Sequence, residues 1–196
     1  MKNFVPPAAD FFSRGAETLA PSLLGCLLRK ETGKGYISGL IVETEAYTGD
    51  DPASHSFRGR TERNSVMFER GGFVYVYLVY GVHNCFNITS GIEGRGEAVL
   101  IRAVRPFEGI ELMKLNRGVM EKEYLCNGPG KLCQAFGIER RHNGTSLEDG
   151  EIRLYVPVTG GKPDISVTKR IGISRGVELR RRFTLRDSRW VSRVEQ

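Results

Sequence analysis

The sequence predicts an α+β fold: a single domain over residues 1–196, with a curved antiparallel β-sheet, flanking helices and a protruding β-hairpin. Several runs rich in β-branched and aromatic residues are typical of strands, and two of them are separated by a short turn. The 24 glycines and 8 prolines are spread along the chain, which indicates many turns. A chain of 196 residues is long enough to bury one core.

The first third of the chain predicts a helix followed by a strand. Leucines recur at helical spacing within residues 10–28, and Pro21 with Ser22 suggests a boundary or cap inside that run. Gly33 and Gly35 mark a turn. Residues 36–42 then predict a strand that runs into an acidic stretch.

The middle of the chain predicts an irregular loop and then a hairpin. Residues 48–72 lack periodicity and interleave arginines with small polar residues, and loops of this length are usually functional or disordered. Residues 73–81 and 85–89 predict the two strands of the hairpin. Tyr80 falls at its turn, where an exposed aromatic invites a partner.

The rest of the chain predicts a second group of elements. Residues 98–104 form an apolar strand with Arg102 embedded in it, and a buried guanidinium needs acceptors, of which Glu43 and Glu45 are the nearest in kind. Helices are expected at 106–116 and 131–136. Closing strands are expected at 151–157 and 165–173.

The stretch Val42-Glu43-Thr44-Glu45-Ala46-Tyr47 is the candidate site. Because strand side chains alternate between faces, Glu43, Glu45 and Tyr47 share one face, and His55 follows eight residues later. A lone pair of glutamates at a strand end is more often exposed or salt-bridged than catalytic. The functional interpretation therefore depends on the rest of the chain.

The net charge of +6 is concentrated at the C-terminus. Residues 169–195 hold nine Lys and Arg against three acidic residues, so the first 168 residues carry twenty charges of each sign. Such segregation suits a phosphate-bearing partner, and a solvated basic tail is an equal alternative.

The remaining composition excludes several classes of protein. No apolar run approaches the length of a membrane span, and the N-terminus has no signal-peptide core, so we expect a cytoplasmic protein with no membrane partner. The four cysteines form no C-x-x-C pair and are expected to be small buried hydrophobes. No spacing typical of metal ligands is present, and we expect neither a metal nor a cofactor.

Together these residues suit an enzyme that takes a base out of a duplex. Aromatic side chains beside a polar floor, within a phosphate-binding surface, can stack on an extruded base. A carboxylate at that floor can activate water as a general base.

The chain resembles the alkyladenine (3-methyladenine) DNA glycosylase family of the mammalian type, which is also found in bacteria. The resemblance covers nearly the whole chain. Its most specific blocks are Val42–Tyr47, Arg63-Asn64, Tyr75–Gly81, Leu125–Gln134 and Arg170–Ile173.

The resemblance implies a monofunctional glycosylase of base excision repair, which hydrolyses the N-glycosidic bond of alkylated or deaminated purines in double-stranded DNA. Glu45 would be the general base, and Arg102 with the backbone carbonyl of Ile171 would hold the attacking water. The expected protein is a monomer that works on DNA in the cytoplasm, at the nucleoid in a bacterium.

The resemblance also implies how the DNA is held. Tyr47 and Tyr77 would sandwich the flipped base, with His55 at its edge, and Asn87 would screen its exocyclic groups. Tyr80 would enter the gap left in the duplex. Arg60 and Arg63 would bind the DNA backbone.

Two positions depart from the family pattern, and a third has no role in it. Val82 and His83, beside the predicted wedge, replace bulkier or aromatic residues, which leaves the lesion search and the range of substrates open. His142 has no family role and is expected at the surface.

Three other functions are consistent with parts of the pattern. A binding module without catalysis would leave Glu45 structural, but a pure binder gains nothing from a carboxylate facing phosphates. A zinc base deaminase needs H-x-E and P-C-x-x-C motifs, which are absent. A glycosidase acting on free sugars could pair Glu43 with Glu45, but it would not explain the hairpin tyrosine or the basic segment.

Overall fold

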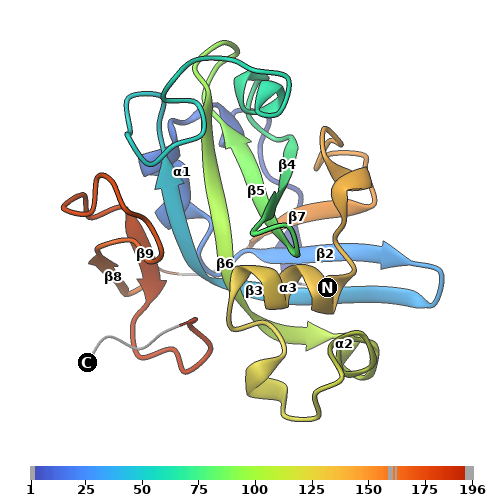
Figure 1. The fold of residues 1–196 in the computed structure, drawn as a ribbon. Coiled ribbons are helices and arrows are strands. Elements are labelled where there is room, and N and C mark those ends of the chain that lie inside the picture. The colour runs from blue at the N-terminus through green and yellow to red at the C-terminus, as the bar shows by residue number, and fades with distance from the viewer. Residues whose placement is uncertain (1–2, 159–160, 162, 193–196) are drawn as a thin grey trace.

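The structure, a computed structural model, describes residues 3–158, 161 and 163–192. Over these residues it forms an antiparallel sheet with short helices packed against it, so the predicted α+β class is confirmed (Figure 1). The sheet order is β1-β7-β2-β3-β6-β5-β4, and the β8–β9 hairpin attaches to β3. No helix in the described part of the chain is long and apolar enough to cross a membrane.

The long strand β3 (Gly35–Tyr47) is the centre of this sheet. Along its first half it pairs with β2 (Leu27–Thr32), and along its second half it pairs on the same side with β9 (Arg182–Leu185). Its other side pairs with β6 (Glu97–Glu108). The acidic end of β3 is therefore flanked by a strand on each side and is buried.

Two irregularities bend β3 and β6 at this point. One extra residue on β3, Val42, lies between the pairs Ile41–Val104 and Glu43–Ala103. One extra residue on β6, Arg102, lies before the pair Thr44–Ile101. Bulges of this kind re-aim side chains and increase strand twist. Figure 1 shows β3 turning out of the β2–β3 ladder into the upright part beside β6.

The remaining strands complete the sheet. The predicted hairpin is confirmed as β4 (Val74–Val79) and β5 (His83–Ser90), and β5 pairs with β6. At the other edge β7 (Ile152–Pro157) pairs with β2 and with β1 (Phe4–Val5). The short strand β8 is Ile165–Thr168.

The helices are α1 (Ala16–Ser22), α2 (Ile110–Arg117) and α3 (Pro129–Phe136). Short 3-10 turns are Phe11–Ser13, Ser65–Phe68, Lys122–Tyr124 and Arg140–His142. Helix α1 packs on the face of β3 that carries Thr44, whose hydroxyl donates to the Ala20 carbonyl at 2.9 Å. The opposite face of β3 is left for Glu43, Glu45 and Tyr47.

The predicted helix over residues 10–28 is wrong over more than half of its length. Helix α1 ends at Ser22, one residue after Pro21, and Gly25 has a φ of 82°. Leu27 and Leu28 then lie in β2, where both are buried. The leucine spacing resembled that of one helix because Leu19 of the helix and Leu28 of the strand, on either side of a turn, pack in the same core.

Smaller boundaries also differ from the prediction. Residues 106–108 complete β6, and α2 begins only after Gly109, whose φ is 70°. The closing strand predicted at 165–173 stops at Thr168 as β8, and a loop leads from there to β9. Strands β1, β2 and β9 were not predicted.

Two predictions about buried side chains have opposite outcomes. All four cysteines are free and buried, as expected. His142 was expected at the surface, but it is 2% exposed. Its Nδ1 accepts from the Glu139 backbone N–H at 2.9 Å, and its Nε2 lies 3.3 Å from Glu151. It therefore caps a short helical turn.

Candidate active site

A cavity of about 630 Å³ opens beside the end of β3. Its volume lies within the range of roughly 300–1,000 Å³ common for small-molecule sites. Its walls come from the loop after β3, the β4–β5 hairpin, β6 and the loop between β8 and β9. They include seven of the predicted site residues: Tyr47, His55, Tyr77, Tyr80, Asn87, Arg102 and Ile171.

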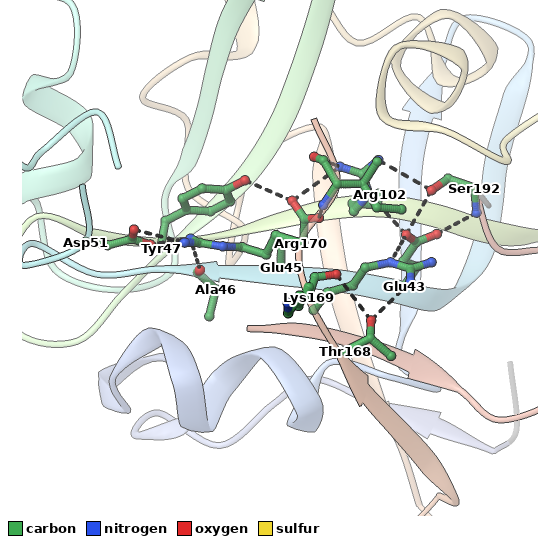
Figure 2. Close-up of polar contacts among 12 residues, drawn as sticks. Glu43, Glu45, Ala46, Tyr47, Asp51, Arg102, Thr168, Lys169, Arg170 and Ser192 are labelled. Atoms are coloured by element: carbon green, nitrogen blue, oxygen red, sulfur yellow. Dashed lines mark hydrogen bonds and ion pairs between the residues drawn. The ribbon is translucent and has the colours of Figure 1, made fainter. Parts of the chain in front are cut away.

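Glu45 is fully buried and lies directly behind this wall. Its Oε1 accepts from the backbone N–H of Ile171 at 2.8 Å. Its Oε2 accepts from Arg102 Nη1 at 3.2 Å and from the Tyr47 hydroxyl at 2.9 Å. Figure 2 shows Tyr47 and Arg102 meeting at this carboxylate. All three partners line the cavity, so hydrogen bonds connect the carboxylate to three parts of its wall.

Arg102 reaches this position because it is the extra residue of the β6 bulge. Its Nη1 faces Glu45 and also lies 3.5 Å from the carbonyl oxygen of Ile171. Its Nε donates to Glu43 at 3.0 Å, which confirms that both glutamates are its acceptors. Burial works against the charged guanidinium, but Glu45 and Glu43 together raise the pKa of Arg102 above its usual value.

Ile171 presents both backbone groups to the site. The next residue, Gly172, has a φ of 77°, a conformation that other residues rarely adopt. The turn there lets the chain leave while the N–H of Ile171 reaches Glu45 and its carbonyl reaches Arg102.

A buried ion pair braces the wall around Tyr47. Arg170 and Asp51, both buried, pair through two guanidinium nitrogens, and Arg170 also donates to the Ala46 carbonyl at 3.0 Å. The guanidinium lies 4.6 Å from the centre of the Tyr47 ring, a cation–π contact that Figure 2 shows from the side. Burial, and next the charge of Glu45, raise the pKa of Tyr47 well above its usual value, so the phenol keeps the proton that it donates.

The opposite wall is aromatic. The rings of His55 and Tyr77 meet edge to face with centroids 4.4 Å apart, and His55 Nδ1 lies 2.9 Å from the Tyr75 hydroxyl. Burial raises the pKa of Tyr77, whose hydroxyl also bonds to Cys85. His55 is an exposed residue, but loss of water around its ring and the nearby charge of Arg63 lower its pKa. The lowered pKa favours the neutral imidazole at pH 7.

Asn87 is buried at the base of the cavity. Its amide nitrogen donates to the carbonyls of Tyr75 at 3.1 Å and Cys85 at 3.4 Å. These two bonds fix the direction of the side chain.

Tyr80 is 89% exposed at the tip of the β4–β5 hairpin. Both Tyr80 and Gly81 have positive φ, 52° and 74°, as the tight turn of a hairpin requires. A positive φ is unusual for an aromatic residue. The turn thus holds a large apolar side chain out from the rim of the cavity.

The predicted phosphate-binding arginines differ in their surroundings. Both are exposed and lie outside the cavity wall. Arg63 Nη2 lies 3.5 Å from the Leu78 carbonyl, whereas Arg60 pairs with Glu69 at 3.2 Å. Two other exposed arginines, Arg58 and Arg175, line the cavity directly and were not singled out from the sequence.

Over its described residues, 169–192, the basic C-terminal segment is neither a solvated tail nor a uniform surface. Arg182 is buried in β9 and donates to Glu43 at 2.8 Å. Arg181 pairs with Glu17 and Asp51, and Arg170 pairs with Asp51. Arg182 meets Glu43 because β9 pairs with β3, and the sequence did not reveal this strand. The positions Arg193 to Gln196 lie outside the described residues.

Among the residues that the structure describes, no group of three His, Cys, Asp or Glu side chains is arranged to hold a metal ion.

Comparison with known proteins gives one consistent result. Residues 10–189 match the family model described as methylpurine-DNA glycosylase. A protein of Methanoculleus marisnigri, named "Putative 3-methyladenine DNA glycosylase", is 48% identical over 192 residues, which covers 95% of this chain and 98% of that protein. A protein of the same name from Carboxydothermus hydrogenoformans is 46% identical, covering 94% and 97%.

Proposed function

The chain belongs to the methylpurine-DNA glycosylase family and is a DNA glycosylase, a hydrolase of N-glycosyl bonds. We propose that it removes damaged purines from double-stranded DNA by base flipping. It would act as a monofunctional enzyme, with water as the nucleophile and an abasic site as the product. It would act on DNA in the cytoplasm, and in a bacterium this means at the nucleoid.

One observation carries the proposed mechanism. Glu45, Arg102 Nη1 and the Ile171 carbonyl converge behind a cavity walled by aromatic rings. A water molecule held among a carboxylate, a carbonyl and a guanidinium has its proton directed at an acceptor and its lone pair free. We place the nucleophilic water there.

The chemistry follows from that position. The water oxygen bonds to the anomeric carbon of the deoxyribose as the bond from that carbon to the purine nitrogen breaks. Glu45 takes the proton, and its negative charge stabilises the positive charge that develops on the sugar. A cationic alkylated purine leaves as a neutral base, whereas hypoxanthine needs a proton on its ring.

The aromatic walls would hold the extruded base. Tyr47 and Tyr77 would stack on its faces, and stacking is worth about 1–3 kcal/mol per base. This is comparable to the few kcal/mol that flipping costs, a cost that is lowest at a damaged pair. Neutral His55 would bond to the edge of the base, and the fixed amide of Asn87 would screen its exocyclic groups.

The exposed features around the cavity fit a duplex. Tyr80 would fill the gap left in the stack, and Arg60 and Arg63 would contact the backbone. Every residue proposed for the site comes from one chain, so a monomer suffices. Over the described residues the cavity wall contains no lysine, which supports water rather than an amine as the nucleophile.

The test is single-turnover cleavage of labelled duplexes carrying hypoxanthine, ethenoadenine or methylated purines. Strand breaks should appear only after hot alkali, and Glu45→Gln should bind the duplex while losing cleavage by at least about 100-fold. Strand breaks without alkali would contradict the monofunctional proposal. A Glu45→Gln variant as fast as wild type would refute the role of Glu45 as general base. No cleavage of any of these lesions would contradict the proposed removal of damaged purines.

A further inference from the structure

Glu43 is a second buried carboxylate two residues from Glu45, and the proposed chemistry does not use it. It is completely buried and lines no part of the cavity. Burying a charge is costly unless it is paired and hydrogen-bonded. Its partners therefore indicate what it does.

Those partners come from three separate parts of the chain. Oε1 accepts from Arg102 Nε at 3.0 Å, from Arg182 Nε at 2.8 Å and from the Ser192 hydroxyl at 2.8 Å. Oε2 accepts from the backbone N–H of Ser192. Figure 2 shows Ser192 and Arg102 meeting at this carboxylate.

The contacts of Arg102 divide between the two glutamates. Nε bonds to Glu43, and Nη2 lies 3.4 Å from the Ser192 hydroxyl, so two nitrogens are held on the side away from the cavity. The third, Nη1, is the one that faces Glu45 and the Ile171 carbonyl. A planar guanidinium held at two nitrogens has the direction of its third nitrogen fixed.

We propose that Glu43 and Ser192 are positioning residues that aim Arg102 Nη1 at the reacting water. This inference rests on the proposed role of Glu45 and Arg102. Arg182 supplies the second positive charge, so that two carboxylates and two guanidiniums balance in the buried cluster. Ser192, which follows β9, thereby takes part in the site although it does not line the cavity.

The test compares four variants with wild type: Glu43→Gln, Ser192→Ala, Ser192→Thr and Glu97→Gln. Glu97 is the matched control, because it is also a buried glutamate on the sheet, but it bonds to the Ala16 N–H and pairs with Arg95. Single-turnover excision and affinity for an abasic-site duplex are measured for each, together with the melting temperature.

Misplacing a catalytic group by about 1 Å can slow a reaction about 100-fold. Glu43→Gln should therefore slow excision about 100-fold, and Ser192→Ala about tenfold, while affinity for the abasic-site duplex stays at the wild-type value. Ser192→Thr keeps the hydroxyl and should restore most of the rate. Glu97→Gln should lower the melting temperature without a comparable loss of rate.

A second readout does not depend on excision. Solvent exchange of the Arg102 Nη2 hydrogens, which face the Ser192 hydroxyl, is followed by ¹⁵N NMR and assigned with Arg102→Lys, and it should be faster in Ser192→Ala than in wild type. If wild type excises nothing, the proposed function fails, and this exchange still decides whether Ser192 holds Arg102.

Three outcomes would overturn the inference. One is wild-type excision by both Glu43→Gln and Ser192→Ala in an enzyme that Glu45→Gln inactivates. Another is an equal loss of rate in Glu97→Gln at an equal loss of stability. The last is an Arg102 exchange rate in Ser192→Ala equal to that of wild type. Because this measurement uses only Ser192→Ala, it tests the inference even if Glu43→Gln fails to fold.

Discussion

The arginines around the cavity fall into two groups that differ in what neutralises them. The floor arginines are buried, and each is paired with a carboxylate: Arg102, Arg170 and Arg182. The rim arginines are exposed and lie at or near the cavity mouth: Arg58, Arg63 and Arg175. Only the second group has its charge open to a phosphate.

The difference shows why a charge count does not locate a binding surface. The segment after residue 168 carries the whole net charge of the chain, yet Arg170 and Arg182 are neutralised by Asp51 and Glu43. Arg58 and Arg63 belong to the part of the chain that balances to zero. Burial, which separates the two groups, is a property of the fold.

The largest expected effect comes from breaking a floor pair. Asp51→Asn leaves the Arg170 charge buried without its counter-ion, and such a loss costs about 3–5 kcal/mol of unfolding free energy. Urea denaturation measures it. The neighbouring exposed residue gives the control, because Asp50→Asn should change stability by less than about 0.5 kcal/mol. Equal effects at the two positions would remove the distinction between floor and rim.

The rim arginines should affect DNA binding rather than stability. Each arginine that contacts a phosphate contributes about one unit to the slope of log affinity against log salt. The double variant Arg58→Ala, Arg175→Ala should therefore reduce that slope by about two, with unfolding unchanged. Fluorescence anisotropy over a salt series measures the slope. A slope equal to that of wild type would show that these side chains face no phosphate.

Another exposed arginine, outside the rim group, sharpens the comparison because it already has a carboxylate partner. Arg60 pairs with Glu69, and their side chains are 57% and 42% exposed. An exposed pair is worth about 0.2–1 kcal/mol, so Glu69→Gln should cost no more than that in urea denaturation. If Arg60 binds a phosphate, the same variant frees it, and DNA affinity at low salt should rise. A fall in affinity would contradict that role.

The smallest expected effect is that of the Arg63 charge on the pKa of His55. Burial and then Arg63 lower the pKa of His55, so Arg63→Ala should raise that pKa without returning it to 6.5. In wild type the unfolded chain binds more protons between the folded pKa and 6.5, so this residue's contribution falls as the pH drops through that window. In Arg63→Ala, the contribution of His55 to the unfolding free energy should fall less over the same drop in pH. An NMR titration of His55 tests the direction, and an unchanged pKa would show that Arg63 is screened.

Local features of the fold could be predicted where one uninterrupted run of residues corresponds to one element. The hairpin strands and the strand carrying Arg102 were predicted from runs of β-branched, aromatic and apolar residues, and the helix before Gly137 was predicted because it follows Gly128-Pro129-Gly130. The leucines from Leu19 to Leu27 were misread because the repeat crosses a turn. Strand β9 was missed because the arginines around it look like a surface until Glu43 and Asp51 are placed beside them.

The candidate site was likewise predicted only in part. Tyr47, Tyr77 and Arg102 were predicted as its members, and they line one cavity. The roles of Asp51, Ser192 and Arg175 could not be predicted, because each depends on a loop approaching from over a hundred residues away, as the separation of 149 residues between Ser192 and Glu43 illustrates. The sequence offered one signal for the role of Glu43, namely an acidic residue two positions from Glu45 after an apolar run. That role became visible only once its partners on β6 and β9 were placed beside it.

These long separations have a consequence for how the protein folds. Glu43 meets Arg182 across 139 residues, and Asp51 meets Arg170 across 119. Contacts between distant segments form late, because chain closure must precede any gain from them. Until β9 arrives, the acidic end of β3 stays hydrated, since an unpaired charge resists burial. We therefore expect the sheet around β4, β5 and β6 to form in the folding transition state, and the catalytic floor to close last.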